Sequence, residues 1–265
     1  MKNVLQKAAE ESGRLLVKRF RERKHEIGYK SSHQDFYTQA DIESQAMIKN
    51  IITEEMVKNG ASPDEIGFIG EENLHAKSTK HLFIIDPLDG TTNFASGLDL
   101  FAISIAHCLN GEIIEGIIYR PTNNDLYFAK KGEGAYKNGK RLSISPVSDL
   151  KNSLLDGIIS SRKDVYPKMF KILQRIFPTV KGFRSIFCMT LSDCFLADNI
   201  FNLTVNGNTF IWDIAVSKLL VEEAGGEMFD FYGNDVNLDI YDPAKAYQVI
   251  SCHKNIKKKV LEYFK

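Results

Sequence analysis

Two amphipathic helices are predicted at the start of the chain. Apolar residues recur at helical spacing between lysines, arginines and glutamates, at Val4, Leu5, Ala8, Leu15, Leu16 and Phe20. A second helix is predicted from about Asp41 to Lys58, with Asp41 as its N-cap and Asn59-Gly60 as its end. Its buried side is expected to carry Ile42, Ala46, Ile48, Ile51, Ile52 and Met56.

Strand patterns follow these helices. The segment EIGFIG predicts a strand through Ile69 that breaks into an acidic loop at Glu71 and Glu72. The apolar run from Leu82 to Ile85 is typical of a buried central strand, which the turn residues from Pro87 onward are expected to stop. Asn110-Gly111 separates two more apolar runs and predicts a hairpin. The first half therefore indicates two helices and an antiparallel-rich sheet.

The pattern changes from about residue 145. Helical patterns alternate with short apolar runs, the helices near residues 166–177, 188–197 and 213–224 and the runs at 153–160 and 247–252. This alternation favours a second, layered α/β subdomain. We expect subdomains at residues 1–144 and 145–265, packed as one body because no Pro/Ser-rich linker separates them.

Composition and charge exclude several classes of protein. The chain has 265 residues, with 34 basic and 34 acidic side chains and a formal net charge of zero. No whole-molecule field therefore favours nucleic acid or an anionic membrane. The four cysteines include no C-x-x-C pair, and no segment resembles a leader or a membrane span. We expect a cytoplasmic protein with reduced thiols.

Carboxylates gather at three places. Glu71 and Glu72 follow one predicted strand, and Asp86 and Asp89 stand at the carboxyl end of the next, where α/β sheets usually place ligands. Asp213 begins a strongly apolar helix, so its carboxylate should point inward. Each place has an ordinary alternative, namely a solvated loop, a turn-forming aspartate and a helix N-cap.

These acids together indicate a metal and phosphate site. Several carboxylates in one place must be protonated or balanced by cations, because like charges raise one another's pKa. Mg²⁺ is the natural partner of an all-oxygen site. The backbone N–H groups of Gly90, Thr91 and Thr92, entering a helical turn, would form a pocket for an anion. A metal beside a phosphate pocket predicts phosphoryl transfer.

Three segments resemble the signature blocks of the inositol monophosphatase family, within the lithium-sensitive, magnesium-dependent phosphatase superfamily. They are GEE at 70–72, DPLDGTTNF at 86–94, and WD at 212–213 followed by EAGG at 223–226. The resemblance extends over residues 4–254. It implies an α+β fold, a layered αβαβα sandwich with an N-terminal antiparallel-sheet subdomain and a C-terminal α/β subdomain. It also implies a homodimer and lithium sensitivity.

The resemblance assigns a role to each matching residue. Two or three Mg²⁺ ions would be held by Glu71, Asp86, the Leu88 carbonyl, Asp89 and Asp213. The catalytic residues would be Glu71, Thr91 and Asp41, with Thr91 bound to the attacking water and Asp41 fixing Thr91. Substrate would contact Gly90, Thr91, Thr92, Asn206 and Asp213, and Lys30 and Glu72 would form an outer shell. Lys30 can equally be a surface lysine.

The implied mechanism is direct, in-line hydrolysis by water that the metal ions activate. A different phosphatase superfamily uses an aspartate nucleophile in a D-x-D-x-T pattern. Here the aspartates stand in D-x-x-D-G-T, Asp86 to Thr91, so a covalent aspartyl-phosphate fits poorly.

Departures from the family pattern gather where the alcohol part of a substrate would bind. Phe187 and Met189 replace a glycine and small residues, and Asn202 and Asn206 replace acidic residues. Asparagine carries no charge and binds hydroxyls differently from a carboxylate. Phe187 itself is expected to be an ordinary core residue.

Three functions stay open. The first is a phosphomonoesterase for inositol 1-phosphate or a related small polyol phosphate. The second is a phosphatase for another ester, such as a 3′-phosphonucleotide, fructose 1,6-bisphosphate or histidinol phosphate. The third is a transcription-accessory protein that acts through protein contacts, as some bacterial relatives are thought to do.

Overall fold

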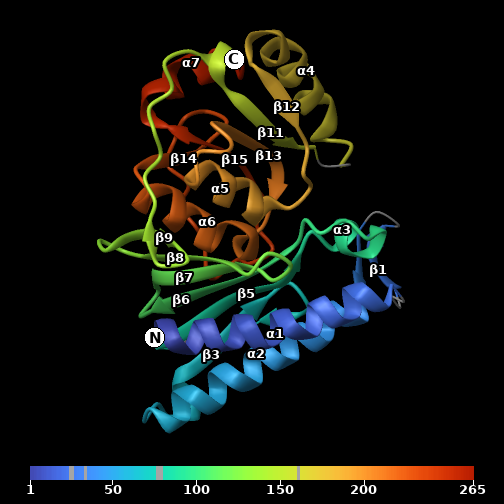
Figure 1. Ribbon diagram of the computed structural model, residues 1–265, viewed down its shortest axis with the longest axis vertical. Helices are drawn as coiled ribbons and strands as arrows, with labels where there is room; N and C mark the ends of the chain where they lie inside the picture. The colour runs from blue at the N-terminus through green and yellow to red at the C-terminus, as the bar shows by residue number, and fades with distance from the viewer. Residues whose placement is uncertain (24–26, 33–34, 76–79, 160–161) are drawn as a thin grey trace.

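The structure, a computed structural model, describes residues 1–265 except 24–26, 33–34, 76–79 and 160–161; the side chains of residues 30–32 and 35 also lie outside the description. Figure 1 shows alternating layers of helix and sheet. Helices α1 (Lys2–Glu22) and α2 (Gln39–Lys58) form the first layer, and helices α4 (Tyr166–Ile176) and α7 (Lys257–Leu261) form the last. The expected α+β sandwich is confirmed.

Helix α2 begins earlier than its sequence predicts. Thr38 is the N-cap, and its N–H and Oγ1 donate to Asp41 Oδ2 at 2.7 and 2.6 Å. Asp41 is thus the third helical residue of a capping box, so its assignment as N-cap is wrong. Ile42 is 37% exposed and Ala46 is also exposed, against expectation, because the buried side of α2 includes the polar stripe Asp41, Ser44 and Gln45.

The first sheet has eight strands, in the order β10-β9-β8-β7-β6-β5-β3-β4. Their bounds are β3 (Ile66–Gly70), β4 (Leu74–His75), β5 (His81–Asp89), β6 (Ala102–Leu109), β7 (Glu112–Arg120), β8 (Asp125–Lys130), β9 (Gly134–Lys137) and β10 (Lys140–Arg141). All neighbours are antiparallel except β3 and β5. Leu109 pairs with Glu112, which confirms the hairpin at Asn110-Gly111. A separate pair, β1 (Ile27–Ser32) and β2 (Asp35–Thr38), precedes α2.

The second sheet has five strands, in the order β12-β11-β13-β15-β14. Their bounds are β11 (Leu154–Ile158), β12 (Gly182–Arg184), β13 (Leu203–Thr209), β14 (Gly226–Asp230) and β15 (Tyr247–His253). Strand β11 is parallel to β12 and β13, whereas β15 is antiparallel to β13 and β14. The sequence LTVNGNT of β13 was not predicted as a strand, because Asn-Gly resembles a turn signal.

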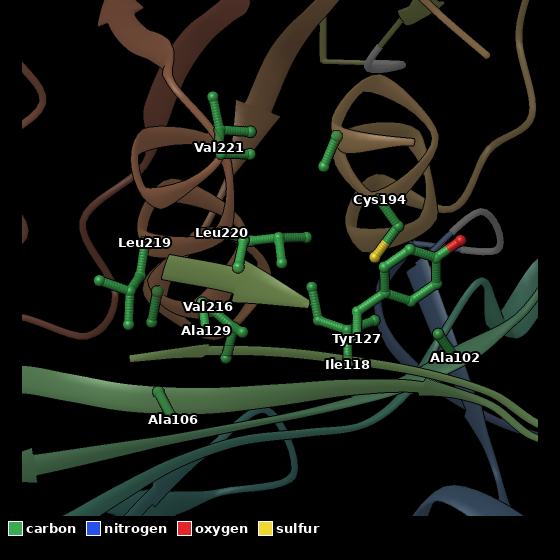
Figure 2. Close-up of a cluster of buried hydrophobic side chains, with 14 of the residues drawn as sticks. Ala102, Ala106, Ile118, Tyr127, Ala129, Cys194, Val216, Leu219, Leu220 and Val221 are labelled. Carbon is green, nitrogen blue, oxygen red and sulfur yellow. The ribbon is translucent and has the colours of Figure 1, made fainter. Parts of the chain in front are cut away.

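Helices α5 (Met189–Ala197) and α6 (Ile211–Glu223) lie between the two sheets. Figure 2 shows part of the apolar cluster that joins them, with Tyr127 of β8 beside Cys194 of α5. Helix α6 approaches β7 closely at Gly116, where a Cβ would lie 2.7 Å from Val216 Cγ2. The bulky Val216 is therefore accommodated by a glycine on the facing strand.

The remaining short helix, α3 (Thr91–Ser96), follows β5 directly. In two further apolar clusters, α1 and α2 pack on the eight-stranded sheet and α4 packs on the five-stranded sheet. A smaller cluster includes Met189 of α5, Ile214 of α6 and Val249 of β15. Cys108, Cys188, Cys194 and Cys252 are free, buried thiols. Within the described residues, no helix is both long and apolar enough to cross a membrane.

Candidate active site

The polar stripe of α2 contacts three segments of the site, namely the end of β5, the turn at Glu72 and the start of α3. Ser44 Oγ donates to the Pro87 carbonyl at 2.7 Å. Gln45 binds the main chain of Glu72 twice, because its Nε2 donates to the Glu72 carbonyl at 2.8 Å and its Oε1 accepts from the Glu72 N–H at 3.2 Å. Asp41 binds Thr91 at the start of α3. The positions of these segments are therefore set by one helix face with i, i+3, i+4 spacing.

The half-buried Thr91 hydroxyl and the buried Asp41 carboxylate form a pair. Thr91 Oγ1 lies 3.1 Å from Asp41 Oδ1 and 3.0 Å from the Leu88 carbonyl, and its one proton can be donated to either. Burial, followed by the charge of Glu71, raises the pKa of Asp41 to about 7. The lone pairs of the Thr91 hydroxyl can accept a hydrogen bond from water.

Strand β5 ends later than predicted, because it continues through Asp86 and Pro87 to Asp89. Its pairing with β6 shifts register between Asp86 and Asp89, so an irregularity of the ladder separates the two acids. Asp86 Oδ1 accepts the Leu88 N–H at 3.0 Å. Both acids are therefore presented by the last residues of a buried strand rather than by a free loop.

The Asp89 carboxylate caps the beginning of α5. It accepts the N–H groups of Met189 and Thr190 at 3.1 and 2.6 Å, the Thr190 hydroxyl at 2.6 Å and the Cys188 thiol at 3.2 Å. Burial raises the pKa of Asp89, and the hydrogen bonds from Thr190 oppose that rise. The second half of the chain thus contacts the acidic motif directly.

Asp213 lies at the first turn of α6 and faces the same acids. Its Oδ2 accepts the Phe210 N–H at 2.6 Å. Burial and the charges of Asp89 and Glu71 raise the pKa of Asp213 well above its usual value, and burial with the charges of Glu71, Asp89 and Asp213 does the same for Asp86. The structure therefore brings Glu71, Asp86, Asp89 and Asp213 together.

The donor chemistry of this cluster fits a hard divalent cation. Buried carboxylates that repel one another need protons or a cation, and their ligand atoms are all oxygens. Among the described residues, no three His, Cys, Asp or Glu side chains are already arranged as ligands of a single ion. Asp86 and Asp213 each direct one oxygen at a backbone N–H and keep the second for other partners.

Gly90 forms the turn between the acids and α3. Its φ of +88° is in the left-handed region, and a Cβ there would lie 2.7 Å from the Leu100 carbonyl oxygen. Both facts require glycine at this position. Thr91 and Thr92 follow as the first residues of α3, with Thr92 exposed.

Asn206 was predicted to bind substrate, and Glu72 and Lys30 were predicted to form an outer shell. Asn206 on β13 is 1% exposed, and neither its Oδ1 nor its Nδ2 has a hydrogen-bond partner among the described residues. Glu72 is buried beside Gln45. The backbone of Lys30 lies in β1, but its side chain is outside the described residues, so its prediction has no structural outcome.

Comparison with known proteins agrees with this geometry. The family model described as inositol monophosphatase family matches residues 1–265. This chain belongs to the inositol monophosphatase family. An inositol-1-monophosphatase of Rhizobium meliloti (strain 1021) is 31% identical over 263 residues, which cover 98% of this chain and 94% of that protein.

Two other relatives of this inositol monophosphatase family member carry a different name. A Nus factor SuhB of Pasteurella multocida (strain Pm70) is 32% identical over 238 residues, covering 88% of this chain and 86% of that protein. The crystal structure of extragenic suppressor protein suhB from Bartonella henselae has a TM-score of 0.89 and 30% identity, over 100% of this chain and 98% of that chain. Its fold and that of this chain are the same.

Sequence reasoning missed several residues that position the site. Ser44 and Gln45 were overlooked because polar residues on α2 resemble a solvated helix face. Asn93 was overlooked although it lies inside DPLDGTTNF; its Nδ2 donates to the carbonyls of Leu100 and Ile186 at 2.8 and 2.7 Å. The spacing of Asp41, Ser44 and Gln45 was the available signal.

Proposed function

We propose that this protein is a Mg²⁺-dependent phosphomonoesterase that hydrolyses inositol 1-phosphate or a related small polyol phosphate. One observation carries the proposal: the charges of Glu71, Asp86, Asp89 and Asp213, which come from three separate segments of the chain, act on one another next to the Gly90 turn. Membership of the inositol monophosphatase family supports it. The name of the Rhizobium relative favours inositol 1-phosphate as the first substrate to test.

Glu71, Asp86, the Leu88 carbonyl, Asp89 and Asp213 would hold the metal ions. When bound, Mg²⁺ supplies the positive charge that balances these acids and the phosphate oxygens and makes water more acidic. The amides of Gly90, Thr91 and Thr92 would orient the phosphate group. Asp213 would also contact the alcohol part of the ester.

Thr91 and Asp41 would receive the proton of the attacking water. The Thr91 hydroxyl accepts a hydrogen bond from water while it donates its own proton toward Asp41 Oδ1, 3.1 Å away. Burial and the charge of Glu71 raise the pKa of Asp41, which makes its carboxylate a better proton acceptor. Glu71 would orient the same water.

The first experiment measures release of inorganic phosphate from inositol 1-phosphate. We expect turnover that needs Mg²⁺ and falls by about 10²-fold or more in Thr91→Val, because that change removes the hydroxyl that orients water. Thr91→Ser keeps the hydroxyl and should keep most of the activity. Full activity in the presence of a chelator would overturn the proposal.

The identity of the alcohol is a separate question. Asn206 carries a neutral amide in the middle of β13 and is 1% exposed, so it supplies no charged contact to a sugar hydroxyl. A panel containing inositol 1-phosphate, fructose 1,6-bisphosphate, a 3′-phosphonucleotide and histidinol phosphate, ranked by kcat/KM, distinguishes the alternatives. Preference for one of the other three would replace inositol 1-phosphate in the proposal.

The name Nus factor SuhB supports a second candidate function, a contact with the transcription machinery. This contact would need the protein surface and not the acids. Co-purification with RNA polymerase that survives Asp86→Asn would support it. If the wild-type protein binds no transcription factor, this second candidate function is rejected. The homodimer, the lithium sensitivity and the cytoplasmic location remain predictions of the family resemblance.

A further inference from the structure

Phe187 has an unusual backbone and an exposed ring. It lies between β12 and α5 with a φ of +54°, a conformation that bulky L-residues rarely adopt. Its side chain is 46% exposed, so the expectation that it is a core residue is wrong. Ile186 before it packs against the central apolar cluster and Cys188 after it is fully buried, whereas Phe187 belongs to no apolar cluster of the described chain.

Contacts from both sides hold this backbone in place. Asp156 Oδ1 on β11 accepts the Ile186 N–H at 3.0 Å. Asn93 Nδ2 on α3 donates to the carbonyls of Ile186 and Phe187 at 2.7 and 3.3 Å. A strained residue persists only where its surroundings determine its conformation in this way, and such residues concentrate at functional sites.

The same contacts place Phe187 next to the Gly90 turn. Asn93 is in α3, which begins directly after Gly90. A Cβ built on Gly90 would lie 3.3 Å from Cys188 Cβ, one residue after Phe187. Cys188 Sγ also contacts Asp89 Oδ2. The backbone of Phe187 therefore lies next to the turn proposed to bind phosphate, and its aromatic side chain is exposed there.

We propose that Phe187 is a specificity-determining residue that selects phosphate esters of cyclic alcohols over those of open-chain polyols. This inference rests on the proposed phosphatase function. When the phosphate lies on the Gly90 turn, the alcohol extends past the neighbouring Phe187. A ring presents a continuous face of C–H groups that packs on an aromatic ring, whereas an open chain offers less apolar area.

The kinetic test compares two esters of secondary alcohols, inositol 1-phosphate and glycerol 2-phosphate. We expect Phe187→Ala to lower kcat/KM about fivefold for the cyclic ester and less than twofold for the open-chain ester. Phe187→Gly should behave like Phe187→Ala, because both lack the ring although only glycine relieves the backbone strain. Phe187→Tyr should keep the wild-type preference for the cyclic ester, because tyrosine retains the aromatic ring.

Phe170→Ala is the matched control. Phe170 is 57% exposed on α4, outside the site, so its loss should change neither rate. Equal losses for the two esters in Phe187→Ala, or no loss for either, would overturn the role of Phe187. If Phe187→Ala lowers the rate and Phe187→Gly does not, the change in rate comes from the backbone conformation and not from the ring. That result would also overturn the role of Phe187.

A binding measurement separates this inference from the proposed function. Calorimetric titration in Mg²⁺ uses phenylphosphonate and methylphosphonate, which cannot be hydrolysed and differ in the ring alone. Phenylphosphonate should bind the wild-type protein about fivefold more tightly than methylphosphonate, and Phe187→Ala should abolish the difference. Equal affinities in the wild type would overturn the inference. Failure to hydrolyse any ester would overturn the proposed function, while the titrations still decide the role of Phe187.

Discussion

At the scale of single residues, stability and function oppose each other at Asp86. Its carboxylate is buried, and burial together with Glu71, Asp89 and Asp213 raises its pKa well above the usual value. An acid with a raised pKa stabilises the fold only while it is protonated, and this contribution is lost as pH rises through the raised pKa. Without a cation, mutual repulsion within the cluster therefore destabilises the protein increasingly as pH rises.

We therefore predict that Asp86→Asn is more stable than the wild type in the absence of Mg²⁺ and is inactive. Asparagine removes one buried charge, so Tm at pH 8 should rise by about 5 °C. Thermal unfolding followed by circular dichroism, with and without a chelator, measures the effect. A lower Tm for the variant in chelator would contradict the account of charge repulsion.

A second prediction concerns backbone strain at Phe187. The left-handed conformation costs an L-residue about 1–2 kcal/mol relative to glycine, so Phe187→Gly should raise Tm by about 3 °C. Phe187→Ala keeps the strained conformation and should not raise it. Thermal unfolding of the two variants side by side gives the answer, and a Tm for Phe187→Gly at or below that of Phe187→Ala would refute the strain.

Sequence reasoning found the acidic residues of the site but not the side chains that position them. Asp86, Asp89 and Asp213 belong to contiguous motifs whose chemistry is visible in the sequence. The partners Ser44 and Asn93 bind carbonyl groups of remote segments, and no local pattern reveals such contacts. The exposure of Phe187 was missed for the same reason, because it depends on bonds from α3 and β11.

At the scale of elements, α5 connects the acids to the five-stranded sheet. Its N-terminal N–H groups bind Asp89, and its buried Asp193 accepts the hydroxyl of Thr204 on β13 at 2.7 Å. Burial raises the pKa of Asp193 from 3.8 to about 7. Asp193 is therefore a buried acid that has no role in the proposed reaction.

The raised pKa of Asp193 predicts that Asp193→Asn becomes more stable than the wild type as pH rises. The folded pKa of Asp193 is raised, so its contribution to stability is complete below about pH 4 and is lost as pH rises through about 7. The variant should unfold like the wild type near pH 4 and be more stable at pH 8 by up to about 4 kcal/mol. Urea unfolding at pH 5, 6, 7 and 8 measures the trend. A difference that does not grow with pH would contradict the burial of an ionisable Asp193.

The elements themselves were predicted unevenly from the sequence. Helix α4 is clearly amphipathic, whereas α5 and α6 are buried on most sides; all three were expected within a few residues of their observed bounds. Strand β13 was missed because its polar residues resemble a turn, yet its pairing with β11 and β15 makes it central. Tertiary pairing therefore overrides local propensity in this segment.

At the scale of the whole molecule, the proposed metal site connects the two sheets. Asp86 and Asp89 end a strand of the eight-stranded sheet, while Asp213 begins α6, which packs between the sheets. The layered fold was predictable from the alternation of elements and from the family resemblance. The division at residue 144 remains a prediction.

We predict that Mg²⁺ raises Tm of the whole protein in one cooperative step. Ligand at 100 times its Kd stabilises the folded state by about 2.7 kcal/mol, which corresponds to roughly 5–10 °C for a chain of this size. Scanning calorimetry over a Mg²⁺ series tests this, with NaCl at matched ionic strength as the control. Asp86→Asn should lose the shift. An equal shift in NaCl would show that the effect is ionic strength alone.

The capping of α5 by Asp89 has a consequence for biosynthesis. Asp89 is translated long before Met189 and Thr190, whose N–H groups bind it. On the ribosome, the nascent eight-stranded sheet therefore carries acids whose hydrogen-bond donors and fourth carboxylate, Asp213, have not yet been made. Catalytic competence must await the last third of the polypeptide, so a truncated translation product should be inert toward phosphate esters.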